Sequence, residues 1–259
     1  MKTTVISIIS LFFAMSHVAA ARQDLTVLKF REPGDRLDQS IINELEHTED
    51  IGADWLKKKQ NSNGSFGEKN PAECTPVVML ALSHKGAGNV VFHALKWLTD
   101  NSSGNYDTTI HSAAWQYAAV AVADTGGRYK ALLRKNRECL IRRKKNLEGI
   151  SLSLVNEILL SVSPPCNTAD SAVIKTDDTD FSDKYLSYLK MWLKARSINR
   201  AGRQVSDRNG NPIDWRRIYA HRLISSQKIG SDGGGSWPGK NSDDTIMNTA
   251  MALLIIKEL

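Results

Sequence analysis

The sequence of 259 residues predicts an all-α protein, and three observations lead to that fold class. Apolar residues recur at helical spacing in one segment after another from about residue 38 onward. Loops rich in glycine, proline and asparagine separate those segments. No run of alternating apolar and polar residues is long enough to indicate a strand ladder. Long helices joined by loops are typical of an all-α domain.

The first residues have the composition of a secretory signal peptide. A single lysine precedes an apolar stretch over 5–15, and small residues suitable for cleavage follow it. That stretch is about half as long as the ~20 residues that a membrane span needs, and an uncleaved anchor is the alternative. We expect no transmembrane segment after cleavage and a secreted or periplasmic protein. The expected organisation is a signal peptide at 1–21, a short N-terminal segment at 22–37 and one helical domain at 38–259.

The expected helices follow from the apolar periodicity and from its breaks. The first runs from Asp38 to about Gln60. The second runs from about Thr75 to His84, with Pro76 in its first turn, where proline is tolerated. Glycine and proline pairs at 126–127 and 164–165 mark the ends of later helices. Further helices are expected over 90–100, 109–124, 128–149, 151–162, 183–197, 214–227 and 245–259, with polar loops over 163–181 and 199–212.

The helix expected over 128–149 is strongly basic. Lysine and arginine crowd the stretch Arg134–Lys145, while leucine and isoleucine give it an apolar stripe. The chain as a whole has a formal net charge of +6. A solvated helix face explains the stretch, and contact with an anionic envelope surface or another polyanion is the functional alternative. Nucleic acid is not an expected partner, because aromatic residues are not interleaved with these charges.

Three stretches repeat one plan, in which a helix ends, a glycine two residues before an aromatic makes a turn, and a hydroxyl residue opens the next helix. Glycine permits the turn with positive φ, and the ring can pack over the end of the preceding helix. Gln60 or Gln227 can hydrogen-bond exposed backbone at a helix terminus. A helix pair cannot bury its faces alone, so neighbouring units must stack. The glycine–aromatic pairs are Gly64 and Phe66, Gly104 and Tyr106, and Gly235 and Trp237; the hydroxyl residues are Thr75, Ser112 and Thr249.

These stretches, QNSNGSFG and QKIGSDGGGSWPG with the following TAMALL, resemble the repeats of squalene cyclases and of protein prenyltransferase β subunits. The resemblance covers three units directly and most of the mature chain by extension. It implies an α/α toroid, with an inner ring of helices inside an outer ring and a central cavity at one end. A helical hairpin array of another kind is the alternative. The residues that the resemblance would place at a ligand-binding rim are Gly235, Trp237, Phe66 and Tyr106.

Cyclases of this family protonate their substrate with an aspartic acid in a DxDD motif that threonine follows. Asp243 and Asp244 precede Thr245 in register, but Asn241 stands where the first aspartate would be. Capping of a helix N-terminus also explains this stretch. A second acidic cluster, TDDTD over 176–180, has its aspartates in an order that differs from the DxDD motif. The candidate acids are therefore Asp243, Asp244, Asp177, Asp178 and Asp180.

Neither the metal chemistry nor the covalent chemistry of related toroids is expected. Cys74 lies where a prenyltransferase would have its cysteine ligand to zinc, but Ala72 replaces the aspartate partner and no histidine completes the set. The sequence AECTP also lacks the CGEQ-like motif of thioester domains. We therefore expect no cofactor and no metal. Cys74, Cys139 and Cys166 allow one disulfide at most, and the spacing leaves their pairing open.

The function expected from these observations is that of a binding module without catalytic activity. Its ligand would be an apolar or isoprenoid small molecule or a segment of another protein. Two enzymes remain as alternatives: a divergent terpene cyclase or mutase that uses one of the aspartates, and an enzyme acting on polysaccharide.

Overall fold

The computed structural model describes residues 37–101, 109–124, 126–162, 184–202, 205 and 212–259. Contacts divide the chain into Met1–Asp38 and Gln39–Leu259, and the fold is that of the second unit. Helices form nearly all of its secondary structure, which confirms the all-α class. The expected signal peptide lies outside the described residues. The elements are α2 (Gln39–Lys57), α3 (Pro71–Leu82), α4 (Gly88–Asn101), α5 (Ile110–Ala123), α6 (Lys130–Lys144), α7 (Gly149–Val162), α8 (Lys184–Ala201), α9 (Trp215–Ser226), β1 (Lys228–Ile229), β2 (Gly235–Ser236) and α10 (Ser242–Ile256).

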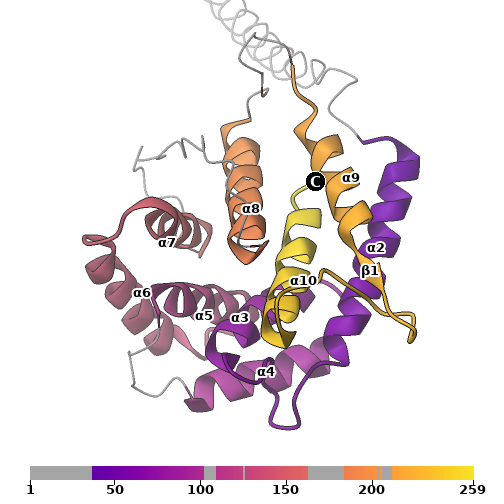
Figure 1. The fold of residues 1–259 in the computed structure, drawn as a ribbon. Helices are drawn as coiled ribbons and strands as arrows, with labels where there is room; N and C mark the ends of the chain where they lie inside the picture. The colour runs from indigo at the N-terminus through magenta and orange to yellow at the C-terminus, as the bar shows by residue number, and fades with distance from the viewer. Residues whose placement is uncertain (1–36, 102–108, 125, 163–183, 203–204, 206–211) are drawn as a thin grey trace, which may run out of the picture. The chain divides into compact units, whose positions relative to one another are not determined.

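Five of the helices contact one another in a closed circuit (Figure 1). α3 packs against α5, α5 against α7, α7 against α8, α8 against α10, and α10 against α3. The other described helices lie against this circuit: α4 contacts α3 and α5, α6 contacts α5 and α7, and α2 and α9 contact each other and α10. From α2 to α7 the two groups alternate along the chain, so α3 and α5 are each followed by a helix that packs on them.

The helices differ in how deeply they are buried. α10 is buried at every position from Ile246 to Ile256, which explains why its sequence is apolar all round instead of on one face. Small residues such as Ala114 and Ala119 let α5 approach its neighbours closely. By contrast, Leu140 is the one buried residue that α6 contributes.

Helix α3 begins at Pro71, four residues earlier than its sequence predicts, and it includes Pro76 in its interior. A proline has no N–H to donate to the carbonyl four residues before it, here that of Ala72. That carbonyl accepts a hydrogen bond from the hydroxyl of Ser112 at 2.8 Å and one from the side-chain amide of Gln116 at 3.4 Å. Two side chains of α5 therefore satisfy the acceptor that Pro76 leaves open, and the helix continues.

The first glycine–aromatic turn joins α2 to α3. Gln60 pairs with Phe66 in an antiparallel bridge, and Gly64 between them has a φ of +91°. The side-chain amide of Gln60 donates to the carbonyls of Gly64 and Val90, at 3.0 and 2.9 Å. The N–H of Phe66 donates to Oγ1 of Thr75 at 2.9 Å. The hydroxyl residue thus holds the aromatic residue in place.

The turn between α9 and α10 repeats the antiparallel pairing and the bond from the aromatic residue to a threonine. β1 and β2 pair as antiparallel strands, and the N–H of Trp237 donates to Oγ1 of Thr249 at 3.1 Å. Gly235 is required there, since a Cβ would lie 2.6 Å from the Gln227 amide nitrogen. That nitrogen donates to the carbonyl of Thr48 at 2.9 Å, in the interior of α2 instead of at a helix terminus. The third turn, around Gly104 and Tyr106, lies outside the described residues.

Candidate functional site

Asp243, a candidate acid, lies in the first turn of α10 and has both carboxylate oxygens occupied. Oδ1 accepts the backbone N–H of Glu68 at 2.8 Å, and Oδ2 accepts those of Lys69 at 2.9 Å and Asn70 at 2.8 Å. Only 5% of the residue is exposed. Three N–H donors suit an acceptor-only carboxylate, whereas a general acid needs an O–H directed at its substrate. The observed bonds tie the loop before α3 to α10.

Cys74 and Gly67 complete the packing around this carboxylate. Gly67 has a φ of +83°, and a Cβ there would lie 2.9 Å from Sγ of Cys74 and 3.3 Å from Cγ of Asp243. Burial raises the pKa of the Cys74 thiol, and the charges of Asp243, Glu73 and Asp244 raise it further. A thiol that stays protonated is a poor nucleophile and a poor metal ligand. Within the described residues no three His, Cys, Asp or Glu side chains are grouped to hold a metal ion.

Asp244 takes part in the cap of α10. Oδ1 of Asn241 accepts the backbone N–H of Asp244 at 2.9 Å, and the Asn241 amide donates to Oδ2 of Asp244 at 3.0 Å. These bonds are those of a helix N-cap. The other candidate acids, Asp177, Asp178 and Asp180, lie outside the described residues.

The rings of Phe66 and Trp237 are fully buried. Nε1 of Trp237 donates to the carbonyl of Leu223 near the end of α9, at 2.9 Å. Gly52 of α2 lies against the same ring, because a Cβ there would be 2.9 Å from its Cζ3. Both rings therefore pack between helices, and neither ring exposes a surface that a ligand could contact. Tyr106 lies outside the described residues.

Two further tryptophans pack together inside the circuit. The rings of Trp115 on α5 and Trp192 on α8 have centroids 5.1 Å apart, although α7 separates these helices in the circuit. Trp115 is 1% exposed and Trp192 7% exposed. The rings therefore occupy the space between α5 and α8.

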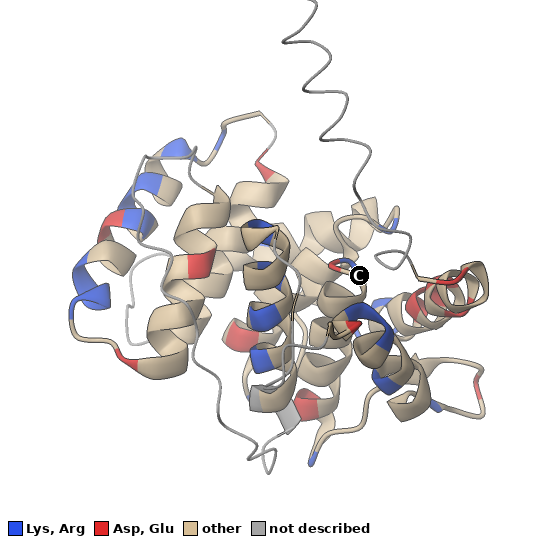
Figure 2. Ribbon diagram, turned by 90° about the horizontal axis from the view of Figure 1, so that it is seen from above, with Lys and Arg blue, Asp and Glu red and all other residues tan. Residues whose placement is uncertain are grey.

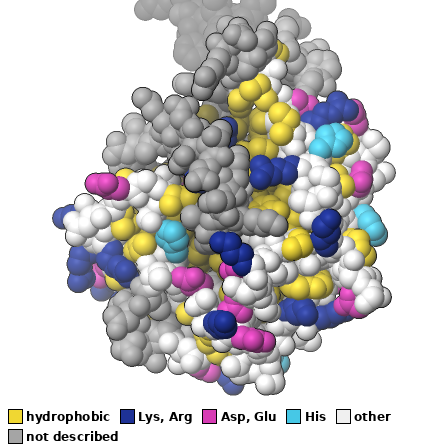
Figure 3. Space-filling view, in the orientation of Figure 1, with side chains coloured by type: hydrophobic (Ala, Val, Ile, Leu, Met, Phe, Trp, Pro, Cys, Tyr) yellow, Lys and Arg dark blue, Asp and Glu magenta, His cyan; other side chains and the backbone are white. Residues whose placement is uncertain are grey.

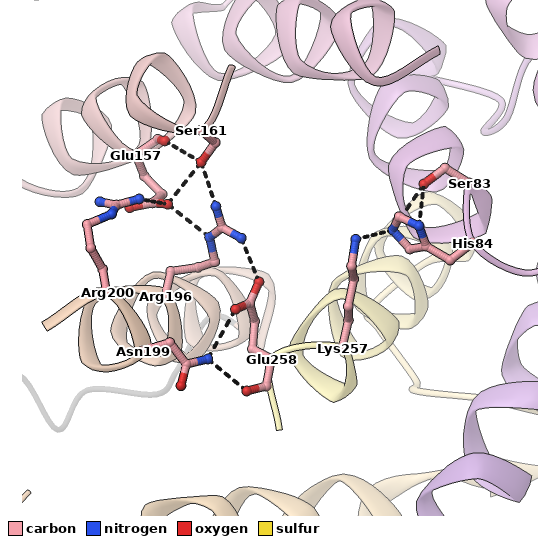
Figure 4. A network of polar contacts seen from close by, with 9 residues as sticks. All are labelled: Ser83, His84, Glu157, Ser161, Arg196, Asn199, Arg200, Lys257 and Glu258. Carbon is pink, nitrogen blue, oxygen red and sulfur yellow. Dashed lines mark hydrogen bonds and ion pairs between the residues drawn. The ribbon is translucent and has the colours of Figure 1, made fainter. Parts of the chain in front are cut away.

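Charged side chains meet near the C-terminal ends of α7, α8 and α10 (Figure 4). Glu157, which is buried, accepts hydrogen bonds from Arg196 at 2.9 Å and Arg200 at 2.6 Å. Arg196 also donates to Glu258 at 2.9 Å and to the hydroxyl of Ser161 at 2.6 Å. Removing one partner of such a buried ion pair leaves an uncompensated charge. The network therefore joins three helices of the circuit.

His84 and Lys257 lie on the other side of the view in Figure 4. The Lys257 ammonium contacts Nε2 of His84, and the hydroxyl of Ser83 lies 3.1 Å from the same nitrogen. Burial lowers the pKa of His84, and the charge of Lys257 lowers it further. Burial also lowers the pKa of Lys257, while Glu258 opposes that change. Burial and the charge of Lys257 both favour the neutral form of His84.

Sequence reasoning did not identify this charged network. Glu157 is separated by 39 residues from Arg196, and Arg196 by 62 residues from Glu258. The sequence feature that indicates a buried ion pair is Glu157, because it is the only charged residue in the apolar segment that forms α7. A lone carboxylate on a buried helix requires a cationic partner.

Helix α6 carries the charge excess of the whole chain. It has seven basic residues and one acidic residue, a formal charge of +6. Removing them from the chain's 34 basic and 28 acidic residues leaves 27 of each elsewhere. Figure 2 shows the basic residues along this helix, and Figure 3 shows basic side chains grouped on the same side of the molecule. Along its first turns lies a surface hollow of about 570 Å³, which is lined by Lys130, Ala131, Arg134, Lys135 and Glu138.

Among the described helices, none is both long and apolar enough to cross a bilayer. Comparison with family models, with curated proteins and with solved structures finds no match to this chain.

Proposed function

We propose that the chain is an exported helical-repeat domain of the α/α-toroid type, and that it is a binding module for an anionic phospholipid surface. The closed circuit of α3, α5, α7, α8 and α10, with four helices packed on it, supports the toroid. The matching bonds at Thr75 and Thr249 support the repeat. The apolar stretch over 5–15 supports export.

The observation that carries the proposed function is the charge of α6. A formal charge of +6 is concentrated on 15 residues, while the rest of the chain is formally neutral. Each lysine or arginine near an anionic bilayer contributes about 1 kcal/mol to binding. A helix of this kind can therefore hold the domain at a membrane without insertion of a span.

An exposed isoleucine favours a bilayer over a dissolved polyanion as the partner. Ile141 is 40% exposed and lies seven residues after Arg134 and four after Arg137, so the three share one helix face. Lys145 continues that face one turn later. Basic residues around an apolar side chain are typical of helices that lie at the interface between headgroups and acyl chains.

The environment of Asp243 does not favour the cyclase alternative. Its oxygens accept three backbone N–H groups, and none of these donors belongs to a substrate. The Trp115–Trp192 pair likewise occupies space inside the circuit that an isoprenoid ligand would use. A surface partner is consistent with both features.

Sedimentation with lipid vesicles tests the proposal. The purified chain should bind vesicles that contain 30% phosphatidylserine more tightly than pure phosphatidylcholine vesicles, and salt should weaken this binding. Arg134→Gln with Arg142→Gln should reduce binding by about 2 kcal/mol, roughly 30-fold. The matched control is Lys58→Gln with Lys59→Gln, which removes the same charge from exposed positions after α2. All variants contain the same residues 1–21, so any contribution of that segment to vesicle binding is equal in each. A difference in binding between the α6 double variant and its control therefore reports on α6.

A second comparison separates a bilayer from a polyanion. Ile141→Ser should weaken binding to the anionic vesicles and leave binding to heparin unchanged. Equal loss of binding in the α6 double variant and in its control would contradict the proposal. So would tight binding to heparin without binding to vesicles.

A further inference from the structure

Three helices that are neighbours in the circuit each place a polar side chain in their first turn. Glu73 is the third residue of α3, His111 the second of α5 and Ser151 the third of α7. α5 packs against both α3 and α7. All three residues are partly exposed, so solvent and a small molecule can reach them.

The closest contact in this group joins His111 to Ser151. Nε2 of His111 lies 2.9 Å from Oγ of Ser151. With the proton of a neutral His111 on Nδ1, Nε2 accepts the hydrogen bond and Ser151 donates it. Glu73 acts on the imidazole through its charge, and its Oε1 is held by the hydroxyl of Thr109 at 2.6 Å. A hydroxyl and a base from neighbouring helices are therefore in contact, and the charge of a carboxylate from a third helix acts on the base.

We propose that Ser151 and His111 are the nucleophile and the general base of a site that hydrolyses carboxylic esters. A serine hydroxyl becomes nucleophilic when a base within hydrogen-bond reach takes its proton. The negative charge of Glu73 stabilises the imidazolium that forms. This activity goes beyond the membrane binding proposed above, and neither proposal rests on the other.

The reaction proceeds in two balanced steps. Oγ of Ser151 bonds to the acyl carbon as its proton passes to Nε2 of His111, and the bond from that carbon to the alcohol oxygen breaks. The departing alcohol takes the proton from His111. Water then attacks the acyl-serine and gives a proton to His111, the bond to Oγ breaks, and His111 returns the proton to Oγ. The products are one carboxylic acid and one alcohol.

Backbone N–H groups beside Ser151 would stabilise the negative charge that develops on the carbonyl oxygen. The first N–H groups of an α-helix have no acceptor within the helix and carry the positive end of its dipole. Gly149, Ile150 and Ser151 form this first turn of α7. Oriented N–H groups of this kind stabilise an oxyanion in acyl transfer.

His111 has the protonation state that a base requires. Burial lowers the pKa of His111, and Glu73 partly opposes that change. The imidazole is therefore neutral at pH 7, so Nε2 can take a proton. The carboxylate of Glu73 then favours the charged ring once the proton has arrived.

Labelling with a fluorophosphonate probe tests the proposal on the full chain. Attack by Oγ displaces fluoride and leaves the probe bonded to the serine, and peptide mapping should place it on Ser151. Ser151→Ala should abolish labelling, and His111→Gln should slow it by about 100-fold, the range for loss of a general base. Hydrolysis of p-nitrophenyl acetate should fall in parallel.

Ser153→Ala is the matched control, since Ser153 lies on the same helix and its hydroxyl bonds to the carbonyl of Gly149. It should label like the unaltered protein. Circular dichroism melting identifies any variant that fails to fold, and mapping on the unaltered chain does not depend on the variants. Absence of the probe from Ser151 in the folded protein would overturn the proposal, as would an unchanged rate in His111→Gln.

Discussion

Asp243 accepts the backbone N–H of Asn70 at 2.8 Å, across 173 positions of the sequence. Asn70 immediately precedes α3, and Asp243 lies in the first turn of α10. Because α3 and α10 are the first and last helices of the circuit, this bond fastens the contact that closes it.

Asp243→Asn should destabilise the fold by about 1.5–3 kcal/mol, the range for hydrogen bonds to a charged group. An asparagine turns N–H groups toward backbone donors and leaves at least one of them unpaired. Urea unfolding measures the change. Asp244→Asn is the control in the same turn, and it should cost about 0.5 kcal/mol, as expected for a charge near a helix N-terminus. Equal losses in the two variants would show that the three backbone bonds do not stabilise the fold.

Gly67→Ala should cost more than Gly86→Ala, although both glycines have positive φ. Each alanine pays about 1–2 kcal/mol for the left-handed backbone. At Gly67 the new methyl group also meets Cys74, whereas a Cβ at Gly86 has nothing within 4 Å. We expect an additional loss of about 1–3 kcal/mol at Gly67 from this overpacking. Thermal melting of the two variants side by side checks the difference, and matching melting temperatures would contradict it.

Glu157→Gln should destabilise the protein by about 2 kcal/mol. A buried ion pair that loses one partner typically costs 3–5 kcal/mol, but the partner arginines here are 28% and 40% exposed and remain partly solvated. Glu138→Gln removes the exposed ion pair with Arg134 on α6 and should cost at most about 0.5 kcal/mol. Denaturant midpoints give both values. A Glu157 variant as stable as the Glu138 variant would rule out a stabilising network.

Stability should rise with pH as the solution approaches pH 6.5 from below. The pKa values of His84 and His111 are both lowered from 6.5 in the folded protein, chiefly by burial. Between the lowered values and 6.5 the unfolded chain binds more protons, so the free energy of unfolding increases with pH in that window and levels off above it. Lys257→Met removes the charge that acts on His84 and should make the rise smaller. Denaturation series from pH 4.5 to 7.5 measure it, and a slope equal to that of the unaltered protein would refute the contribution of Lys257.

Local signals were sufficient to predict several elements of this fold. The helical segments were predicted from their periodicity, but Thr75 and Thr249, which were expected to open helices, lie inside α3 and α10. Each of them accepts the backbone N–H of the aromatic residue in the preceding turn. The start of α3 was misplaced because Pro76 resembles a first-turn proline. Its actual position depends on Ser112, whose hydroxyl satisfies the carbonyl of Ala72 from another helix.

The candidate site shows the limit of such signals more clearly. Asp243 was identified from its neighbours in the sequence as a possible acid or cap. Its bonding to Glu68, Lys69 and Asn70 depends on a loop more than 170 residues away. The contact between His111 and Ser151 likewise joins two helices 40 residues apart, and neither residue belongs to a recognisable motif.

The sequence by itself determined that the chain is helical, that Gly64 makes a turn with positive φ and that α6 is basic, because helical periodicity, positive φ and charge are properties of short segments. Only the tertiary structure decided that α10 meets α3, that Glu157 meets Arg196 and that Ser151 meets His111. Those pairings depend on how buried helix faces pack against distant partners, and the sequence of one helix does not specify which other helix will cover it.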